Sequence, residues 1–197
     1  MLDEKAQLHT LEGVSAATLI LLVIIYAIDA TSMTPLTSST SNAHVQSELV
    51  ALGQDILNTL DYEEPGYNSK LKNDILNWDG NQYIWNGYDY ILDGGTNYLN
   101  NSNLSSILKK TLISQGIAHK VEIVYLINSS NNIITSAPDK MIDAGIPSNN
   151  AVIVSRKIVL QDTDCTGGGC NSGKYLDIDP STNLYNIVDI KLILWRT

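Results

Sequence analysis

Phenylalanine is absent from this 197-residue sequence, cysteine occurs twice, and basic residues are scarce: 12 Lys and Arg stand against 21 Asp and Glu, which gives a net charge of −9. A nucleic-acid binder needs cationic side chains along the phosphate backbone, so this class of protein is not expected. Docking on anionic lipid by charge is disfavoured for the same reason. Two cysteines exclude a disulfide-dense scaffold and a zinc module built from four thiolates.

Sequence motifs of catalysis are also missing. The chain contains no G-x-S-x-G, H-E-x-x-H, phosphate-binding loop or dinucleotide fingerprint. Its three histidines, His9, His44 and His119, are scattered along the sequence and do not suggest a ligand set. We therefore expect neither an enzyme nor a bound cofactor or metal ion. A length of 197 residues with 44% hydrophobic residues suits one domain with a real core.

The hydrophobic residues are concentrated near the N-terminus. Residues 13–28 read GVSAATLILLVIIYAI and carry no charge. As a helix they span about 24 Å, and apolar flanks beyond Glu12 or Asp29 complete a membrane span. The alternatives are a secretory signal peptide and a buried core helix. We expect a retained transmembrane helix. Because Lys5 precedes it and no Lys or Arg follows until Lys70, the N-terminus is expected in the cytoplasm and the rest outside.

The remaining patterns predict an α+β head on a helical stem. Residues 1–30 are the signal or transmembrane helix, 31–62 a Ser/Thr-rich joint with an amphipathic stem helix, and 63–197 an extracellular α+β head. The stretch around Pro35 is either a flexible joint or a kinked helix. We expect short helices over 69–78 and 103–116, and strands over 121–127, 133–135, 151–160, 175–178 and 184–195. The fold class is therefore a long N-terminal hydrophobic helix followed by an antiparallel β-sheet.

Glu12 is a candidate functional residue because a carboxylate at the mouth of an apolar helix is costly unless it is paired. The alternative is that it is solvated. Cleavage between Gln7 and Leu8 would make Glu12 the fifth residue of the mature chain, and cleavage after Ala6 would make it the sixth. In either case the carboxylate could pair with the free α-amine of a neighbouring subunit and set the register of a helix bundle.

The N-terminal segment that contains Glu12 resembles a known family of proteins. The segment AQLHTLEGVSAATLILLVIIYA resembles the class III signal and first helix of type IV pilins and their minor, pilin-like relatives. HTLEG, ATSMTPLTSSTSNAHV and the final VDIKLILWR are similar to an uncharacterised archaeal family of pilin-like membrane proteins. The resemblance implies a subunit that assembles through its N-terminal helix into, or beside, an archaeal surface filament. The implied partners are like subunits or other pilins, the membrane, a prepilin peptidase and the pilus assembly machinery. Glu12 would be the register carboxylate, and Ala6, Gln7 and Leu8 would hold the processing site.

Cys165 and Cys170 bracket the sequence TGGG. Outside the cell such a pair is predicted to form a disulfide at a hairpin tip, with a reduced pair as the alternative. Four acids flank this loop: Asp162, Asp164, Asp177 and Asp179. We interpret them as acidic turn residues, since no EF-hand spacing is present; the alternative is a calcium site formed by D-x-D pairs on neighbouring strands.

Five aromatic residues lie close together among Asn, Asp and Gly: Trp78, Tyr83, Trp85, Tyr88 and Tyr90. We interpret them mainly as part of a small core. As exposed rings they would instead stack on sugars or a partner subunit, which suits a non-polymerising, membrane-anchored adhesion or glycan-binding module. Three N-x-[ST] sequons, at Asn100, Asn103 and Asn128, are candidate glycosylation sites.

Overall fold

The computed structural model describes residues 12–24, 34–99, 102–129, 133–166, 170 and 173–196. The chain divides into two compact units, residues 1–45 and residues 46–197. In the first unit, residues 12–24 form an apolar helix. The second unit holds the sheet and the shorter helices, together with the C-terminal part of α2 (Thr34–Leu60).

The described ranges contain no helix that combines the length and the apolar character needed to cross a membrane. Residues 12–24, the apolar helical segment that the structure describes, correspond to about 20 Å of helix, against a hydrocarbon core of ~30 Å. Helix α2 has 27 residues, but polar residues are spread along its whole length. The predicted long hydrophobic stem helix is therefore wrong. The predicted localisation, a single-pass membrane protein with a cytoplasmic N-terminus and an extracellular head, is likewise not supported.

Helix α2 is described from Thr34, so the Ser/Thr-rich stretch is helical over its described part. Pro35 lies in the first turn, where its missing N–H removes no helical hydrogen bond. Within the second unit α2 buries one apolar stripe at helical spacing, as the sequence predicts. The buried residues of this stripe are Leu49, Ile56, Leu57 and Leu60.

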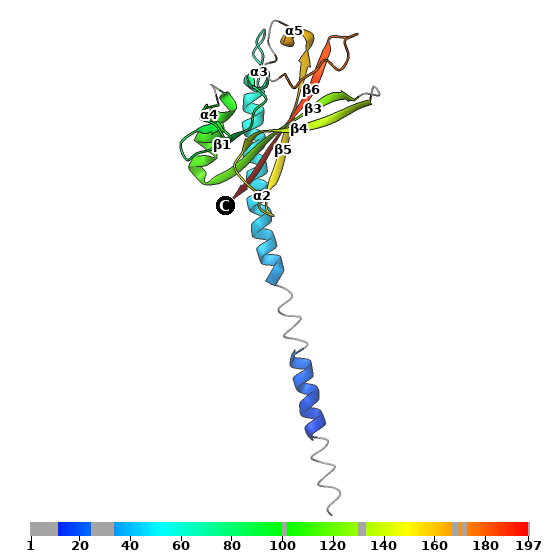
Figure 1. Ribbon diagram of the computed structural model, residues 1–197. Coiled ribbons are helices and arrows are strands. Elements are labelled where there is room, and N and C mark those ends of the chain that lie inside the picture. The colour runs from blue at the N-terminus through cyan, green and yellow to red at the C-terminus, as the bar shows by residue number, and fades with distance from the viewer. Residues whose placement is uncertain are drawn as a thin grey trace, which may run out of the picture. The chain divides into compact units, whose positions relative to one another are not determined.

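Six strands form one mixed sheet in the order β2-β1-β4-β3-β6-β5 (Figure 1). The strands are β1 (Tyr83–Trp85), β2 (Tyr90–Leu92), β3 (Ile117–Ser129), β4 (Ile133–Asp143), β5 (Val152–Gln161) and β6 (Leu184–Arg196). All neighbouring pairs are antiparallel except β1 and β4, which run parallel and pair at Tyr83 and Ile142. The prediction of an antiparallel sheet therefore fails at this join, because the small β1–β2 hairpin adds to the edge of β4 in the same direction.

Two predicted strands differ from the structure. Strand β4 is longer than residues 133–135, because it pairs with β3 along nearly its whole length. No strand forms at residues 175–178. That segment is instead tied to the start of β6 by two hydrogen bonds: the Ile178 amide donates to the Tyr185 carbonyl at 3.0 Å, and the Tyr185 hydroxyl donates to the Tyr175 carbonyl at 3.2 Å.

The two faces of the sheet differ in polarity. One row crosses four strands with apolar, buried side chains: Val154, Leu192, Val121 and Ile142. On the opposite face a row of polar side chains crosses the same strands: Ser155, Lys191, Glu122 and Lys140. Strand alternation thus places a core on one face and leaves a charged surface on the other.

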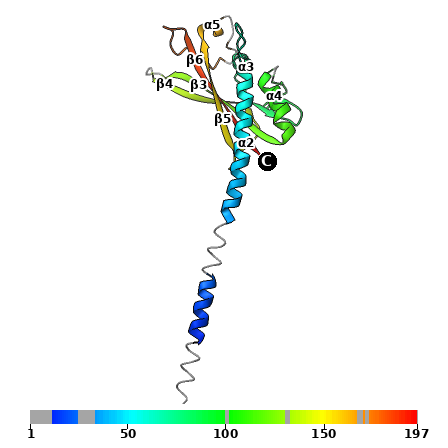
Figure 2. The ribbon, with the colours of Figure 1, turned by 180° about the vertical axis from the view of Figure 1, so that it is seen from behind.

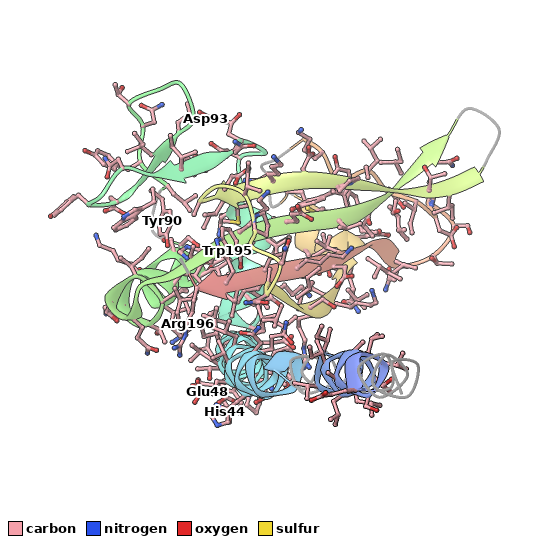
Figure 3. The ribbon with its side chains drawn as sticks, turned by 90° about the horizontal axis from the view of Figure 1, so that it is seen from below. His44, Glu48, Tyr90, Asp93, Trp195 and Arg196 are labelled. Carbon is pink, nitrogen blue, oxygen red and sulfur yellow. A yellow bond between two sulfur atoms is a disulfide. The ribbon has the colours of Figure 1, made fainter. Side chains whose placement is uncertain are left out.

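Helix α2 covers the apolar face over β5 and β6 (Figures 1 and 2). Two ion pairs lie between this region and the strands. Arg156 Nε of β5 is 2.6 Å from Oδ2 of Asp61, the residue after α2. Arg196 Nη2 of β6 is 3.3 Å from Glu48 Oε2 of α2 (Figure 3). Gly53 is the point of closest approach, since a Cβ atom there would be 2.6 Å from Val154 Cγ2. A residue larger than glycine at this position would force Val154 or the helix to shift.

The described part of the second unit also contains three short α-helices, α3 (Lys70–Asn77), α4 (Asn103–Thr111) and α5 (Asp162–Cys165), and a 3-10 helix, η1 (Ile113–Gln115). Ser69 caps α3 by accepting a hydrogen bond from the Lys72 amide. Ser102 caps α4 by accepting a hydrogen bond from the Ser105 amide. Gly116 ends this region in a left-handed conformation, with φ of 68°.

Candidate functional site

The side chain of Asp74 joins helices α3 and α4. It is buried, with 7% of its surface exposed. Its two oxygens accept four hydrogen bonds, from the amides of Asn103 and Leu104, the Asn103 side chain and the Ser102 hydroxyl, at 2.6–3.2 Å. Burial raises the pKa of the Asp74 carboxyl, against the opposite effect of these donors. The carboxylate therefore occupies the N-terminus of α4 and leaves little capacity for another ligand.

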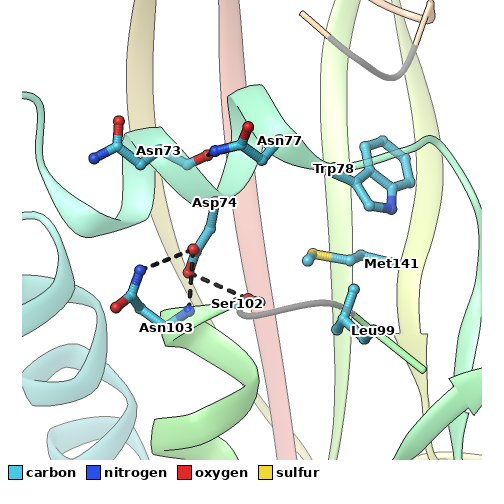
Figure 4. A pocket seen from close by; sticks show the side chains of 8 residues that line it. All are labelled: Asn73, Asp74, Asn77, Trp78, Leu99, Ser102, Asn103 and Met141. Carbon is cyan, nitrogen blue, oxygen red and sulfur yellow. Dashed lines mark hydrogen bonds between the residues drawn. The ribbon is translucent and has the colours of Figure 1, made fainter. Parts of the chain in front are cut away.

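A cavity of about 340 Å³ lies beside this link, between α3 and the start of α4 (Figure 4). Amide side chains from both helices line it on one side, and apolar side chains line the other. The lining residues are Asn73, Asp74, Asn77, Trp78, Leu99, Ser102, Asn103 and Met141. The volume is in the range of small-molecule sites.

Three of the five aromatic residues singled out in the sequence belong to the core. Trp78, Tyr83 and Tyr90 are 2%, 4% and 0% exposed. Each polar atom has a partner: the Trp78 indole N–H donates to the Asn81 carbonyl at 2.8 Å, and the Tyr83 hydroxyl donates to Asp79 Oδ2 at 2.6 Å. These three rings are not available as a stacking surface.

Trp85 and Tyr88 remain accessible, and a lysine lies over both rings. Tyr88 is 75% exposed. Lys109 Nζ is 5.8 Å from the Trp85 ring centroid and 4.7 Å from that of Tyr88. Asp89 holds the same ammonium at 3.3 Å. The accessible part of the aromatic stretch is therefore already engaged with a cation from α4.

His119 and Tyr90 form a buried polar pair between β3 and β2. The Tyr90 hydroxyl is 2.6 Å from His119 Nε2, and His119 is fully buried. Burial lowers the pKa of His119 to about 4 and raises the pKa of Tyr90. Nδ1 of the same ring lies 3.5 Å from the Ile117 carbonyl, which favours the neutral tautomer with Nε2 as acceptor. The pair joins β2 of the β1–β2 hairpin to β3.

The comparisons give the chain a family. A family of unknown function, DUF7288, matches residues 5–194. The chain belongs to DUF7288. An uncharacterized protein of Archaeoglobus fulgidus is similar over 196 residues at 32% identity, which covers 100% of this chain and 95% of that protein. No solved structure matches the chain. No activity is assigned to DUF7288, whose description is a family of unknown function.

The predicted disulfide between Cys165 and Cys170 is present in this DUF7288 protein. Cys165 ends α5, and the preceding Asp164 pairs with Lys72 of α3 at 2.8 Å. The flanking acids do not converge: Asp177 and Asp179 cap their own turn through nearby amides and hydroxyls. The described segments contain no group of three His, Cys, Asp or Glu side chains arranged to hold a metal ion.

The sequons fall in three different settings. Asn100 lies outside the described residues. Asn103 is the first residue of α4, and its side-chain amide donates to Asp74 at 3.1 Å. The hydroxyl residue of that sequon, Ser105, is buried and donates to the Ser102 carbonyl. Asn128 is exposed near the end of β3. Of the two described sequons, the one at Asn128 is the more accessible to a transferase.

The N-terminal candidates are only partly described. Ala6, Gln7 and Leu8, the predicted processing site, lie outside the described residues. Glu12 is exposed in the described helical segment of residues 12–24. Its role in subunit register stays a prediction.

Two polar residues with structural roles escaped sequence reasoning. Asn186 is fully buried on β6, and its amide forms two hydrogen bonds with the Leu126 backbone, at 3.0 and 2.9 Å. An Asn within an apolar strand is a weak signal that could have marked it. Asp74 lies in the sequence LKNDILN, where it interrupts the apolar face of a short helix. That interruption was the available signal for a buried carboxylate.

Proposed function

We propose that this protein is a structural subunit of a type IV pilin-like filament, assembled through contacts between copies of the apolar helix of residues 12–24. One observation carries the proposal. Large apolar side chains on this helix are 50–67% exposed: Val14, Leu19, Ile20, Leu21, Leu22, Val23 and Ile24. The resemblance of this segment to pilin first helices agrees with it.

The distribution of these side chains favours an assembly of many copies over a dimer. Residues 19–24 are consecutive, and each residue advances the helix by about 100°. The helix is therefore apolar around its whole circumference. A helix of this kind is stable only when it is buried on all sides. One partner covers a single stripe, whereas several like helices in a bundle cover every face.

Glu12 gives such a bundle a register. It is the one charged residue of the described helical segment 12–24, and the sequence carries no further charge from residue 13 to residue 28. Among packed apolar helices a carboxylate is stabilised where a cation of a neighbouring subunit meets it. The free α-amine of a processed neighbour would supply that cation. A shift of one subunit along the bundle axis would separate the Glu12 carboxylate from the neighbour's α-amine. The free energy lost with this ion pair would fix the axial spacing of the subunits.

The assembly is tested by cysteine cross-linking of the full chain. No free cysteine is present among the described residues, so an introduced thiol reports its own contacts. Leu22 is 59% exposed in the apolar helix, and Tyr67 is 75% exposed in the second unit. We expect Leu22→Cys to give covalent dimers on mild oxidation and Tyr67→Cys to stay monomeric as the matched control.

A second pair of variants tests the apolar contact itself. Leu22→Asp places a charge in the proposed bundle and is expected to leave the protein monomeric in sedimentation velocity. Tyr67→Asp, with the same charge at a comparably exposed position, should assemble like the wild type. A wild-type chain that sediments as a monomer, or equal cross-linking at residues 22 and 67, would contradict the proposal.

A further inference from the structure

The cavity between α3 and α4 has unused hydrogen-bonding capacity. Asn77 donates one amide N–H to the Asn73 carbonyl at 2.8 Å, and Asn103 donates one to Asp74 at 3.1 Å. Within the described part of the chain, the side-chain amide oxygens of Asn73, Asn77 and Asn103 accept no hydrogen bond. All three residues are exposed and line the cavity. Each therefore offers an acceptor, and a second N–H donor, to a molecule in the cavity.

The charge of the lining excludes several ligand classes. None of the eight lining residues is basic, and Asp74 is acidic, so a phosphate or carboxylate ligand would meet no cation. A metal ion is disfavoured too, because each Asp74 oxygen already accepts two hydrogen bonds. A neutral ligand with several hydroxyl groups remains, since each hydroxyl both donates and accepts, as does each amide side chain.

The opposite side of the cavity adds an apolar surface. Leu99 and Met141 line it, together with the edge of the buried Trp78 ring (Figure 4). A pyranose ring presents hydroxyl groups at its rim and C–H bonds on its faces, so it matches a cavity with amides on one side and apolar atoms on the other. The volume of about 340 Å³ is sufficient for one such ring.

We propose that this cavity binds one neutral pyranose residue of a glycan. The amides of Asn73 and Asn77 bond its hydroxyl groups, and Leu99 and Met141 contact its C–H face. Asp74 acts as a positioning residue, because it fixes Ser102 and Asn103 at the rim through the start of α4. The proposal does not depend on filament assembly, since every residue involved belongs to the second unit.

The test is a titration of the full chain with the methyl glycosides of glucose, galactose, mannose and N-acetylglucosamine. Saturation-transfer NMR reports contact with the sugar protons, and tryptophan fluorescence reports a change near Trp78. We expect one glycoside to bind with a Kd on the order of 1 mM, as suits a ligand of this size. Absence of saturable binding by all four glycosides up to about 100 mM would overturn the proposal.

A matched pair of variants places the binding in the cavity. Asn77→Ala removes an amide but keeps α3, because alanine favours helix and the Asn77 side chain bonds only within its own helix. Its Kd is expected to rise at least about tenfold, the effect of losing hydrogen bonds worth roughly 1.4 kcal/mol. Asn97→Ala removes an exposed amide outside the cavity and should bind like the wild type. Equal binding by the Asn77→Ala and wild-type proteins would refute this site.

Discussion

Gly53 determines how closely α2 approaches the sheet. A Cβ atom at this position would lie 2.6 Å from Val154 Cγ2 and 3.1 Å from Leu194 Cδ1, distances at which atoms have to move apart. Glycine destabilises a helix by up to about 1 kcal/mol relative to alanine. The close packing of α2 on the sheet that glycine permits at position 53 more than offsets this cost. The residue thus marks a place where packing, not helix propensity, sets the sequence.

Gly53→Ala is expected to lower the free energy of unfolding by about 1–3 kcal/mol, because overpacking exceeds the gain in helix propensity. All three tryptophans, Trp78, Trp85 and Trp195, belong to the second unit, so fluorescence during urea denaturation of the full chain reports its unfolding. Val154→Ala removes the clashing methyl groups. In the Val154→Ala background the same glycine substitution should cost less, and an unchanged cost would contradict the overpacking argument.

His119 is expected to make the stability of the protein depend on pH. Its pKa is about 4 in the folded protein, against 6.5 in an unfolded chain, because burial disfavours the imidazolium. Above pH 6.5 both states are neutral at this residue. As the pH falls from 6.5 towards 4 the unfolded chain takes up a proton that the native protein does not. The free energy of unfolding therefore falls, by about 3 kcal/mol at most.

Since carboxylates also titrate near pH 4, the measurement is a comparison with His119→Gln. This variant keeps a polar side chain that does not titrate. Urea denaturation at pH 7, 6, 5 and 4.5 should show a steeper loss of stability for the wild type than for the variant. Parallel curves would mean that His119 does not carry the pH dependence.

At the scale of elements, the join between α3 and α4 depends on one carboxylate. The first amides of a helix have no partners inside it, and here Asp74, from a different helix, binds those of Asn103 and Leu104. Two short helices of 8 and 9 residues are thereby fixed to each other. Neither would be stable in isolation at this length.

Asp74→Ala is expected to destabilise the second unit by about 2 kcal/mol, because it leaves buried donors at the start of α4 unpaired. Hydrogen exchange of the Leu104 amide should accelerate more than that of amides in β3. Asp55→Ala, which removes an exposed acid from α2, is the control and should change neither quantity. An unchanged exchange rate at Leu104 in Asp74→Ala would contradict the assigned role.

The elements show what the sequence could and could not predict. The buried stripe from Leu49 to Leu60 and the apolar run of β6 follow directly from the hydrophobic pattern of the sequence. Each of these patterns lies within one element, so no contact with a distant segment is needed to predict it. The parallel join of β1 to β4 could not be predicted, because it brings together Tyr83 and Ile142, which are far apart in sequence. The cavity was missed for the same reason, as its walls come from α3, the start of α4 and β4.

At the scale of the whole molecule, hydrophobicity alone misled the prediction for the N-terminal region. Residues 13–28 lack charge, yet among the described residues no helix is both long enough and apolar enough to cross a membrane. The same apolar side chains that suggested lipid contact are those on which assembly with like helices is proposed. Composition measures how much apolar surface needs covering, but it does not identify what covers it.

The proposed assembly predicts a specific N-terminus for the protein recovered from cells. If Glu12 pairs with a neighbour's α-amine, that amine has to lie close to Glu12 in sequence, which requires removal of the residues before Gln7 or Leu8. The mass of the N-terminal peptide should therefore correspond to a chain starting at one of these two residues. A chain starting at Met1 would place the α-amine too far in sequence from Glu12 for this ion pair. That result would contradict the proposed role of Glu12 in subunit register, even if Leu22→Cys cross-links as expected.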